Sequence, residues 1–455
     1  MSNNSILSNL QSIVGEEFVS KERELIEVLP QNTQEIQKIV QLANQENIHL
    51  FTNTNDDEFH GISNGDSSGI FINFKRMDKI SNVNLVSRSI IIEPGVSFVQ
   101  LQKELENHGL CAMNPIGLPA SVSALNCYVE RCPLLSAPKP LLAEGWQCIL
   151  DMEVVLPTGE ILKTGASALS NMKKTFYWPF GSGPDLSRVI SGSQGTFGLA
   201  TKASIKIKVM PESRKIQFLS FDKIQDLIDP LYKIERTEIG EMCLLLNKFS
   251  FSTLFSEISS DQKALLEKLP EWIVILYLAG PEEKIKYEVE DLKDIGITPS
   301  SSIASSESSE KIVLDELSCP DRISKLLNYK ENCRKISFYT IIDRLSEFHE
   351  KVGTILQAED YPKQELGILI TPIELGRACF IEYLIFADGS EKEKVEKLYL
   401  EIYKQVVDLG GNVDRPYGPV AGMVYAKNPV HSNFLKYVRD QFDPKGIMNP
   451  NRLIT

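Results

Sequence analysis

The pattern of apolar residues changes at Pro211–Glu212, and this change constrains the organisation of the chain more than any other feature. Before it, short alternating runs typical of β-strands are separated by two helical stripes. After it, helical patterns are interleaved with strongly apolar runs such as 272–278. A chain of 455 residues also suits two or three domains rather than one. We therefore expect a domain boundary near residue 212.

Local signals place individual elements. Asn32 followed by Glu35 resembles a capping box and predicts a helix, whose inward stripe comprises Ile36, Ile39, Val40 and Ala43. A second helix is expected from Ser97 to a stop at Gly109. Strands are expected at 48–51, 70–74, 89–92, 151–156, 160–163, 203–209 and 272–278, and further helices at 282–292 and 391–409. The serine-rich stretch 298–309 is expected to be an exposed loop.

The charge balance argues against nucleic acid and membrane partners. The formal net charge is -13, and an acidic surface repels phosphate backbones and anionic lipids. The first residues lack the basic and apolar regions of a signal peptide, and no run approaches the roughly 18 apolar residues of a spanning helix.

None of the eight cysteines forms a Cys-x-x-Cys pair. We expect a cytoplasmic protein with reduced thiols and no zinc or iron–sulfur site.

Three glycines stand at intervals of three residues in the segment 191–198: Gly192, Gly195 and Gly198. Glycine lets the backbone approach a flat or charged ligand closely. Backbone N–H groups in such turns, together with Thr196, can hold a ring edge or a phosphate. The alternative is a glycine-rich turn that packs against its own strand.

Three stretches together resemble the vanillyl-alcohol oxidase and p-cresol methylhydroxylase (PCMH) superfamily of FAD-linked oxidases, and more distantly glycolate and D-lactate dehydrogenases. They are the strand, Glu-Pro-Gly turn and helix of 89–109, the stretch 152–212, and the C-terminal 442–454. The resemblance implies an α+β fold. It comprises a PCMH-type FAD-binding domain of two α+β subdomains at 1–212, a cap domain with an antiparallel sheet flanked by helices at 213–410, and a segment at 411–455 that returns to the FAD domain.

The two loops that hold FAD in this superfamily depart here from its pattern. The first loop, 52–63, keeps only Gly61 and carries three successive carboxylates at 56–58, where a dianion would lie. Unless these carboxylates point to solvent, they oppose binding by roughly a few kcal/mol. The second loop lacks the usual paired glycines but keeps Asn126. We expect FAD to bind through side chains such as Asn53; the alternative is a chain without FAD that serves as a structural or regulatory subunit.

Two more residues are cofactor candidates. Some relatives attach FAD covalently through a histidine in the first loop, and His60 is the only histidine there. The alternative is a neutral loop histidine without this role. Asn449, in the C-terminal motif, is the second candidate.

The resemblance also implies catalytic residues. Glu144 falls where phenol-oxidising relatives place an acidic residue near the flavin, so it is the candidate acid/base; the alternative is an exposed loop carboxylate. Arg415 falls where an arginine holds the substrate oxyanion in those relatives, and Tyr417 could add a hydroxyl donor. The alternative is a structural arginine that clamps the cap to the FAD domain. A Gly-Glu-His-Gly motif of the hydroxyacid-oxidising branch is absent from this position.

We therefore expect an FAD-dependent oxidoreductase that oxidises a small aromatic or anionic alcohol or phenol-type substrate. Electrons would pass to an electron-acceptor protein or to oxygen, and relatives suggest a homo-oligomer. A D-2-hydroxyacid dehydrogenase of the lactate or glycolate type is a further alternative.

Overall fold

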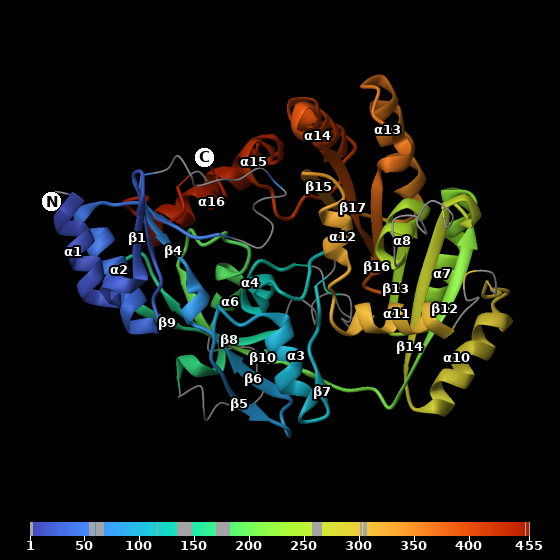
Figure 1. Ribbon diagram of the computed structural model, residues 1–455, viewed down its shortest axis with the longest axis horizontal. Helices are drawn as coiled ribbons and strands as arrows, with labels where there is room; N and C mark the ends of the chain where they lie inside the picture. The colour runs from blue at the N-terminus through green and yellow to red at the C-terminus, as the bar shows by residue number, and fades with distance from the viewer. Residues whose placement is uncertain are drawn as a thin grey trace.

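The computed structural model describes residues 3–53, 60, 68–115, 117–132, 134, 148–169, 183–256, 266–300, 303, 307–450 and 452–454. Within these ranges the chain forms sheets of four, five, two and six strands (Figure 1). Helices and sheets are arranged as an α+β fold, as predicted. Over the same ranges, no helix combines the length and apolar character that crossing a membrane requires.

The N-terminal subdomain is built on the four-stranded sheet. Its strands follow the order β1 (Val19–Glu22), β2 (Leu25–Val28), β4 (Gly69–Ile72) and β3 (Leu50–Phe51), and the β2–β4 and β3–β4 pairs are parallel. Helices α1 (Asn3–Val14) and α2 (Thr33–Glu46) pack on this sheet. Helix α2 starts as predicted, because the Asn32 side chain accepts a hydrogen bond from Glu35 N. The strand predicted at 48–51 is shorter, since Ile48 N still bonds Ala43 O at the end of α2.

The second subdomain is built on the five-stranded antiparallel sheet. Its order is β5 (Ile80–Asn84), β6 (Ser89–Ile92), β10 (Leu199–Lys206), β8 (Ile149–Val155) and β9 (Ile161–Lys163). The accompanying helices are α3 (Phe98–Glu106), α4 (Ala124–Val129) and α6 (Leu186–Ile190). Helix α3 begins at a capping box between Ser97 and Gln100. The strand predicted at 203–209 divides, and its end forms β11 (Lys208–Val209), which pairs with β7 (Leu110–Cys111).

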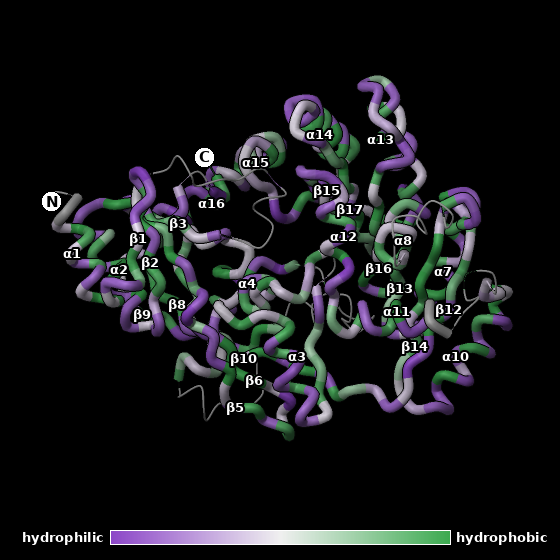
Figure 2. The backbone as a smooth tube through the Cα atoms, in the orientation of Figure 1, coloured by the Kyte–Doolittle hydropathy of each residue, from purple (hydrophilic) through white to green (hydrophobic). Residues whose placement is uncertain are grey.

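The six-stranded sheet forms the cap and is antiparallel throughout. Its order is β12 (Ser213–Phe221), β14 (Trp272–Gly280), β13 (Met242–Asn247), β16 (Gly367–Ile373), β17 (Ala378–Ala387) and β15 (Asn332–Thr340). One face packs against α7 (Ile228–Arg236), α10 (Glu282–Asp294), α13 (Leu345–Ala358) and α14 (Lys392–Asp408). The other face packs against α8 (Lys248–Phe255), α11 (Glu307–Ser318) and α12 (Ile323–Leu327). Hydrophobic and hydrophilic residues alternate along α10 and α14, as expected of helices that cover a sheet (Figure 2).

The prediction that 298–309 forms an exposed loop is wrong in part. Ile303 is buried, at 7% exposure, in the core beneath α8 and α11, and α11 already begins at Glu307. An apolar side chain within the serine-rich stretch anchors it to the cap. The serine-rich composition, on which the prediction rested, does not indicate this buried side chain.

The last part of the chain leaves the cap and packs against both subdomains of the first part. Helices α15 (Gly418–Tyr425) and α16 (Pro429–Phe442) come first. The backbone then pairs with β3, where Leu50 N donates to Ile447 O at 2.7 Å. Ile447 and Met448 lie in the core of the four-stranded sheet, while Leu453 and Ile454 lie in that of the five-stranded sheet. The domain bounds 1–212, 213–410 and 411–455 stay a prediction.

Candidate functional site

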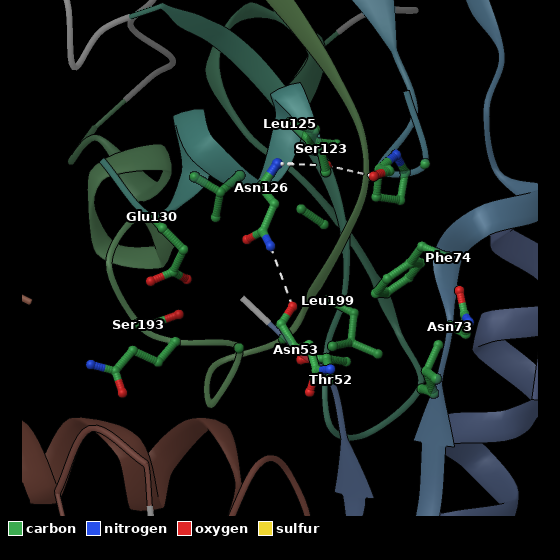
Figure 3. Close-up of a pocket in the computed structure, with 18 of the residues that line it drawn as sticks. Thr52, Asn53, Asn73, Phe74, Ser123, Leu125, Asn126, Glu130, Ser193 and Leu199 are labelled. Atoms are coloured by element: carbon green, nitrogen blue, oxygen red, sulfur yellow. Dashed lines mark hydrogen bonds between the residues drawn. The ribbon is translucent and has the colours of Figure 1, made fainter. Parts of the chain in front are cut away.

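A cavity of about 300 Å³ lies where the four-stranded and five-stranded sheets meet (Figure 3). Its walls come from the ends of β3 and β4, the turn after β6, the segment 121–130 around α4, and the segment 190–200 that contains the glycines. This volume is at the lower end of the range of small-molecule pockets. Of the predicted cofactor residues, four line the cavity: Asn53, Asn126, Gly195 and Gly198.

Asn126 joins the two predicted cofactor loops across this cavity. Its side-chain amide donates to Asn53 O at 3.3 Å. Its backbone N–H donates to Ser123 Oγ at 3.1 Å, since Ser123 caps helix α4. The Ser123 hydroxyl in turn donates to Pro94 O at 2.6 Å, in the turn after β6 (Figure 3). The asparagine retained in the second loop therefore holds Asn53, at the start of the first loop.

The three glycines each pack against another part of the same chain. A Cβ on Gly192 would lie 2.4 Å from Arg131 Nη2, one on Gly195 2.4 Å from Asn449 Nδ2, and one on Gly198 2.8 Å from Val154 Cγ1. All three also have positive φ, which other residues rarely adopt. Gly198 thus packs against strand β8, as in the alternative considered from the sequence, whereas Gly192 and Gly195 pack against the side chains of Arg131 and Asn449. Gly195 and Gly198 also border the cavity, so the two interpretations are compatible.

Asn449 and Thr196 lie behind the cavity wall. Asn449 Oδ1 accepts from Thr52 N at 2.8 Å, and Asn449 Nδ2 donates to Thr52 Oγ1 at 2.9 Å and to Gln194 O at 3.1 Å. The Thr196 hydroxyl donates to Ser193 O at 2.7 Å, and Ser193 lines the cavity. Both residues thus hold lining residues in place; whether they touch the cofactor stays a prediction.

Gln194 is a residue of this site that the sequence analysis missed. It is buried with a φ of 53°, between the glycines. Its side chain donates to Pro416 O at 2.8 Å and accepts from Leu453 N at 3.1 Å. The segment with the glycines therefore grips the C-terminal part of the chain at two places. In the sequence, only the position of Gln194 within Ser-Gly-Ser-Gln-Gly could have indicated that it belongs to the site.

Tyr417 connects the C-terminal part of the chain to the cavity. Its side chain is 2% exposed, and its hydroxyl lies 3.5 Å from Glu130 Oε2, a buried carboxylate that lines the cavity. The His60 ring stacks on the Tyr417 ring with centroids 4.7 Å apart. His60 Nδ1 lies 3.1 Å from the hydroxyl of Tyr399, on cap helix α14. His60 therefore links the first loop to the cap, and a direct role toward the cofactor stays a prediction.

Arg415 is buried where the cap meets the rest of the chain. Its Nη1 contacts Cys132 Sγ at 3.2 Å, and its Nε lies 3.7 Å from Asp414 Oδ1. Burial raises the pKa of Asp414, and the nearby Arg415 and Arg131 guanidinium groups oppose that rise. Burial, followed by the charge of Asp414, raises the pKa of Tyr339 on β15 well above its usual value. Glu144 and Gly61, the other two candidates, lie outside the described residues.

The polar groups that line the cavity suit a dinucleotide. Hydroxyl and amide donors face it from several elements, namely Thr52, Asn53, Asn73, Ser121, Ser123, Asn126 and Ser193. Lys75 supplies a cation near Asn73, whereas the Glu130 carboxylate lies on the opposite side of the view (Figure 3). A Cβ on Gly95 would lie 2.5 Å from Phe74 O. The turn after β6, at Gly95, and the turn after β4, at Phe74, therefore approach each other too closely for a side chain at Gly95. Asn73 and Lys75 would hold phosphates through an amide N–H and an ammonium group, on the side of the cavity away from the Glu130 carboxylate, which repels them.

These features define a nucleotide-cofactor protein of α+β type, with its cavity between two subdomains beside a cap. Comparison with known proteins agrees. Residues 25–125 match the FAD binding domain family, and residues 210–453 match the C-terminal domain of FAD linked oxidases. The second match covers more than half of the chain, and the chain belongs to the FAD-linked oxidase family. Its cofactor is FAD and its class of activity is oxidoreductase.

The sequence relatives and the structural neighbours differ in the substrates that their names state. Glycolate oxidase subunit GlcD from Bacillus subtilis is 22% identical over 453 residues, covering 94% of this chain and 88% of that protein. The mitochondrial cytochrome-type D-lactate dehydrogenase 1 of Saccharomyces cerevisiae is 21% identical over 447 residues, covering 95% and 73%. A 4-ethylphenol oxidase from Gulosibacter chungangensis has a TM-score of 0.83 at 16% identity, with 99% and 97% coverage. p-Cresol methylhydroxylase has a TM-score of 0.83 at 15% identity, with 99% and 96% coverage. The predicted PCMH-type fold is confirmed.

Proposed function

We propose that this chain oxidises a small phenol-type or aromatic alcohol substrate that carries an anionic oxygen. The observation that carries the proposal is the position of Tyr417, buried with its hydroxyl 3.5 Å from the cavity-lining Glu130. The buried Arg415 guanidinium lies two residues earlier. One short segment thus carries a hydroxyl beside a residue that lines the cavity and a buried cation two residues away.

This arrangement suits recognition of a phenolate or carboxylate. A buried guanidinium stabilises an anionic oxygen through charge-assisted hydrogen bonds, and a tyrosine hydroxyl adds a neutral donor. FAD, when bound, supplies the two-electron acceptor that alcohol or phenol oxidation requires. Glu144 remains our candidate to accept the substrate proton. The structural neighbours support a phenolic substrate, because their names specify 4-ethylphenol and p-cresol.

A second candidate function is oxidation of a D-2-hydroxyacid. It is favoured by the sequence relatives, which are named as a glycolate oxidase subunit and a D-lactate dehydrogenase. The absence of a Gly-Glu-His-Gly motif near Arg415 speaks against it. We therefore rank it below the phenol-type substrate.

Anaerobic mixing of the FAD-loaded protein with substrates separates the two candidates. We expect 4-alkylphenols or 4-hydroxybenzyl alcohols to bleach the visible flavin bands, and D-lactate or glycolate to leave them unchanged. Bleaching by the hydroxyacids alone would reverse the ranking. Admitting oxygen or an artificial electron acceptor after bleaching then tests our further proposal that electrons pass to oxygen or to an acceptor protein. Light scattering of the same sample tests the proposed homo-oligomer.

A further inference from the structure

The wall of the cavity that carries Ser121 and Ser123 belongs to a segment that the cap holds in place. This segment lies between β7 and α4 and comprises residues 112–115 and 117–123, which Figure 1 shows beside α11 and α12 of the cap. Asn114 Nδ2 donates to Leu317 O at 3.1 Å and to Ser318 O at 2.7 Å, at the end of α11. Ala120 N donates to Pro320 O at 2.5 Å. We call residues 112–115 and 117–123 the cavity segment.

A third contact to the cavity segment comes from a charged side chain of the cap sheet. Lys335 on β15 is 1% exposed, and its Nζ donates to Gly117 O at 2.6 Å. Glu382 on β17 is 3% exposed, and its Oε1 lies 3.8 Å from the Lys335 ammonium. The Ser337 hydroxyl donates to the same carboxylate oxygen at 3.1 Å. The ion pair thus stands between the cap sheet and the turn at Gly117.

The turn at Gly117 is shaped to meet this pair. Gly117 has a φ of 67°, and a Cβ there would lie 2.1 Å from Glu382 Oε2. Any other residue would push the turn away from the sheet. The same substitution would therefore displace the carbonyl that Lys335 binds.

Cap stability alone does not account for the pair. Its neighbours on this face of the sheet, such as Cys333, Phe380 and Leu384, belong to an apolar core. Withdrawing two charges from water carries a desolvation penalty, and apolar residues of similar volume are often as stabilising or more so. What the pair does specifically is to hold one carbonyl group of the cavity segment, that of Gly117, in place. In some proteins, buried polar or ionic groups serve to fix one conformation.

We infer that Lys335 is a positioning residue for the FAD site. Its ammonium group, held by Glu382, fixes the turn at Gly117 and thereby the serine-bearing wall of the cavity. Docking of the cap sheet and binding of FAD are consequently coupled, although Lys335 does not line the cavity. The inference rests on FAD as the cofactor and is independent of the substrate proposed above.

The test is Lys335→Met, which keeps the side-chain volume but removes the donor. We expect the dissociation constant for FAD, followed by quenching of flavin fluorescence, to rise about tenfold, equivalent to about 1.4 kcal/mol. In the FAD-free protein, amide hydrogen exchange in peptides covering 117–124 should become faster. Asn114→Ala releases the cavity segment at another anchor and should act in the same direction, which keeps the test available if the first variant folds poorly.

Arg334→Met is the matched control. Arg334 is the neighbouring residue of β15, is also cationic and buried, at 7% exposure, and pairs with Glu396 on α14 on the other face of the sheet. We expect it to lower the melting temperature without changing the FAD dissociation constant. A general loss of cap stability would instead weaken FAD binding in both variants and would overturn the inference.

The outcomes separate this inference from the assignment of FAD. A wild-type protein that loads with FAD, beside a Lys335→Met variant with an unchanged dissociation constant and unchanged exchange at 117–124, would overturn the inference alone. A wild-type protein that takes up no FAD would overturn the cofactor and the inference together.

Discussion

Asn449 and Thr52, 397 residues apart in sequence, are joined by two hydrogen bonds in opposite directions. Thr52 N donates to Asn449 Oδ1 at 2.8 Å, and Asn449 Nδ2 donates to Thr52 Oγ1 at 2.9 Å. Asn449 also donates to Gln194 O, so one side chain ties the end of β3 to the segment that contains the glycines. Both tied segments line the cavity. The C-terminal part of the chain is therefore a structural component of the cavity that we propose as the FAD site.

Asn449→Ala should destabilise the protein and lower its FAD content together. The substitution removes three hydrogen bonds and leaves Thr52 N without its partner, which corresponds to about 2–4 kcal/mol in the free energy of unfolding. Urea unfolding and the flavin-to-protein absorbance ratio measure the two effects. Asn428→Ala is the control, because Asn428 only caps exposed helix α16; it should cost about 1 kcal/mol and leave the flavin ratio unchanged. Full flavin content in Asn449→Ala would contradict this account.

Gly195→Ala should destabilise the protein more than a substitution by alanine at another glycine of positive φ. At Gly195 the new Cβ would meet Asn449 Nδ2 at 2.4 Å, whereas at Gly446, with a φ of 65°, it would meet nothing within 4 Å. Gly446→Ala should therefore cost only the backbone strain, about 1–2 kcal/mol. Gly195→Ala should add the displacement of Asn449 and reduce affinity for FAD. Equal melting temperatures and equal FAD dissociation constants in the two variants would remove the steric argument.

Arg415→Ala should weaken binding of an anionic inhibitor such as a substituted benzoate by at least about tenfold, since a charge-assisted hydrogen bond is lost. The ratio of flavin to protein should stay at the wild-type level. Arg377→Ala is the control, because the Arg377 side chain is 74% exposed on the cap. An unchanged inhibition constant in Arg415→Ala would leave Arg415 as a clamp between the cap and the rest of the chain.

His349 should make stability depend on pH below its usual titration range. Burial disfavours the imidazolium, so the pKa of His349 is lowered in the folded protein. The unfolded chain then binds more protons than the folded one between the lowered pKa and about 6.5. The free energy of unfolding should accordingly rise with pH across this interval and level off above it. His349→Gln should flatten the rise in urea titrations, and a slope identical to that of the wild type would rule His349 out.

Local signals in the sequence predicted those parts of the fold that local interactions determine. The starts of α2 and α3 follow from Asn32–Glu35 and Ser97–Gln100, because each cap satisfies its own backbone within one turn. The predicted strand at 48–51 was too long, since Asn47 adopts a left-handed conformation and ends the helix later than the apolar pattern indicates.

The site was predictable only where its residues stand in recognisable segments. Asn53, Asn126, Gly195 and Gly198 were identified this way and line the cavity. Gln194 was missed because its partners, Pro416 and Leu453, lie more than 200 residues away. Lys335 was missed for the same reason, since a lysine in a strand reads as an exposed residue until its contact with Gly117 is known.

The content of FAD in the purified protein tests the central claim most directly. After denaturation and removal of the protein, the released flavin is quantified by its absorbance and compared with the chain concentration. Reconstitution with added FAD precedes the assay if the cofactor is lost during purification. The account predicts about one FAD per chain, bound through the cavity between the two subdomains. A colourless protein that stays empty after incubation with excess FAD would contradict it.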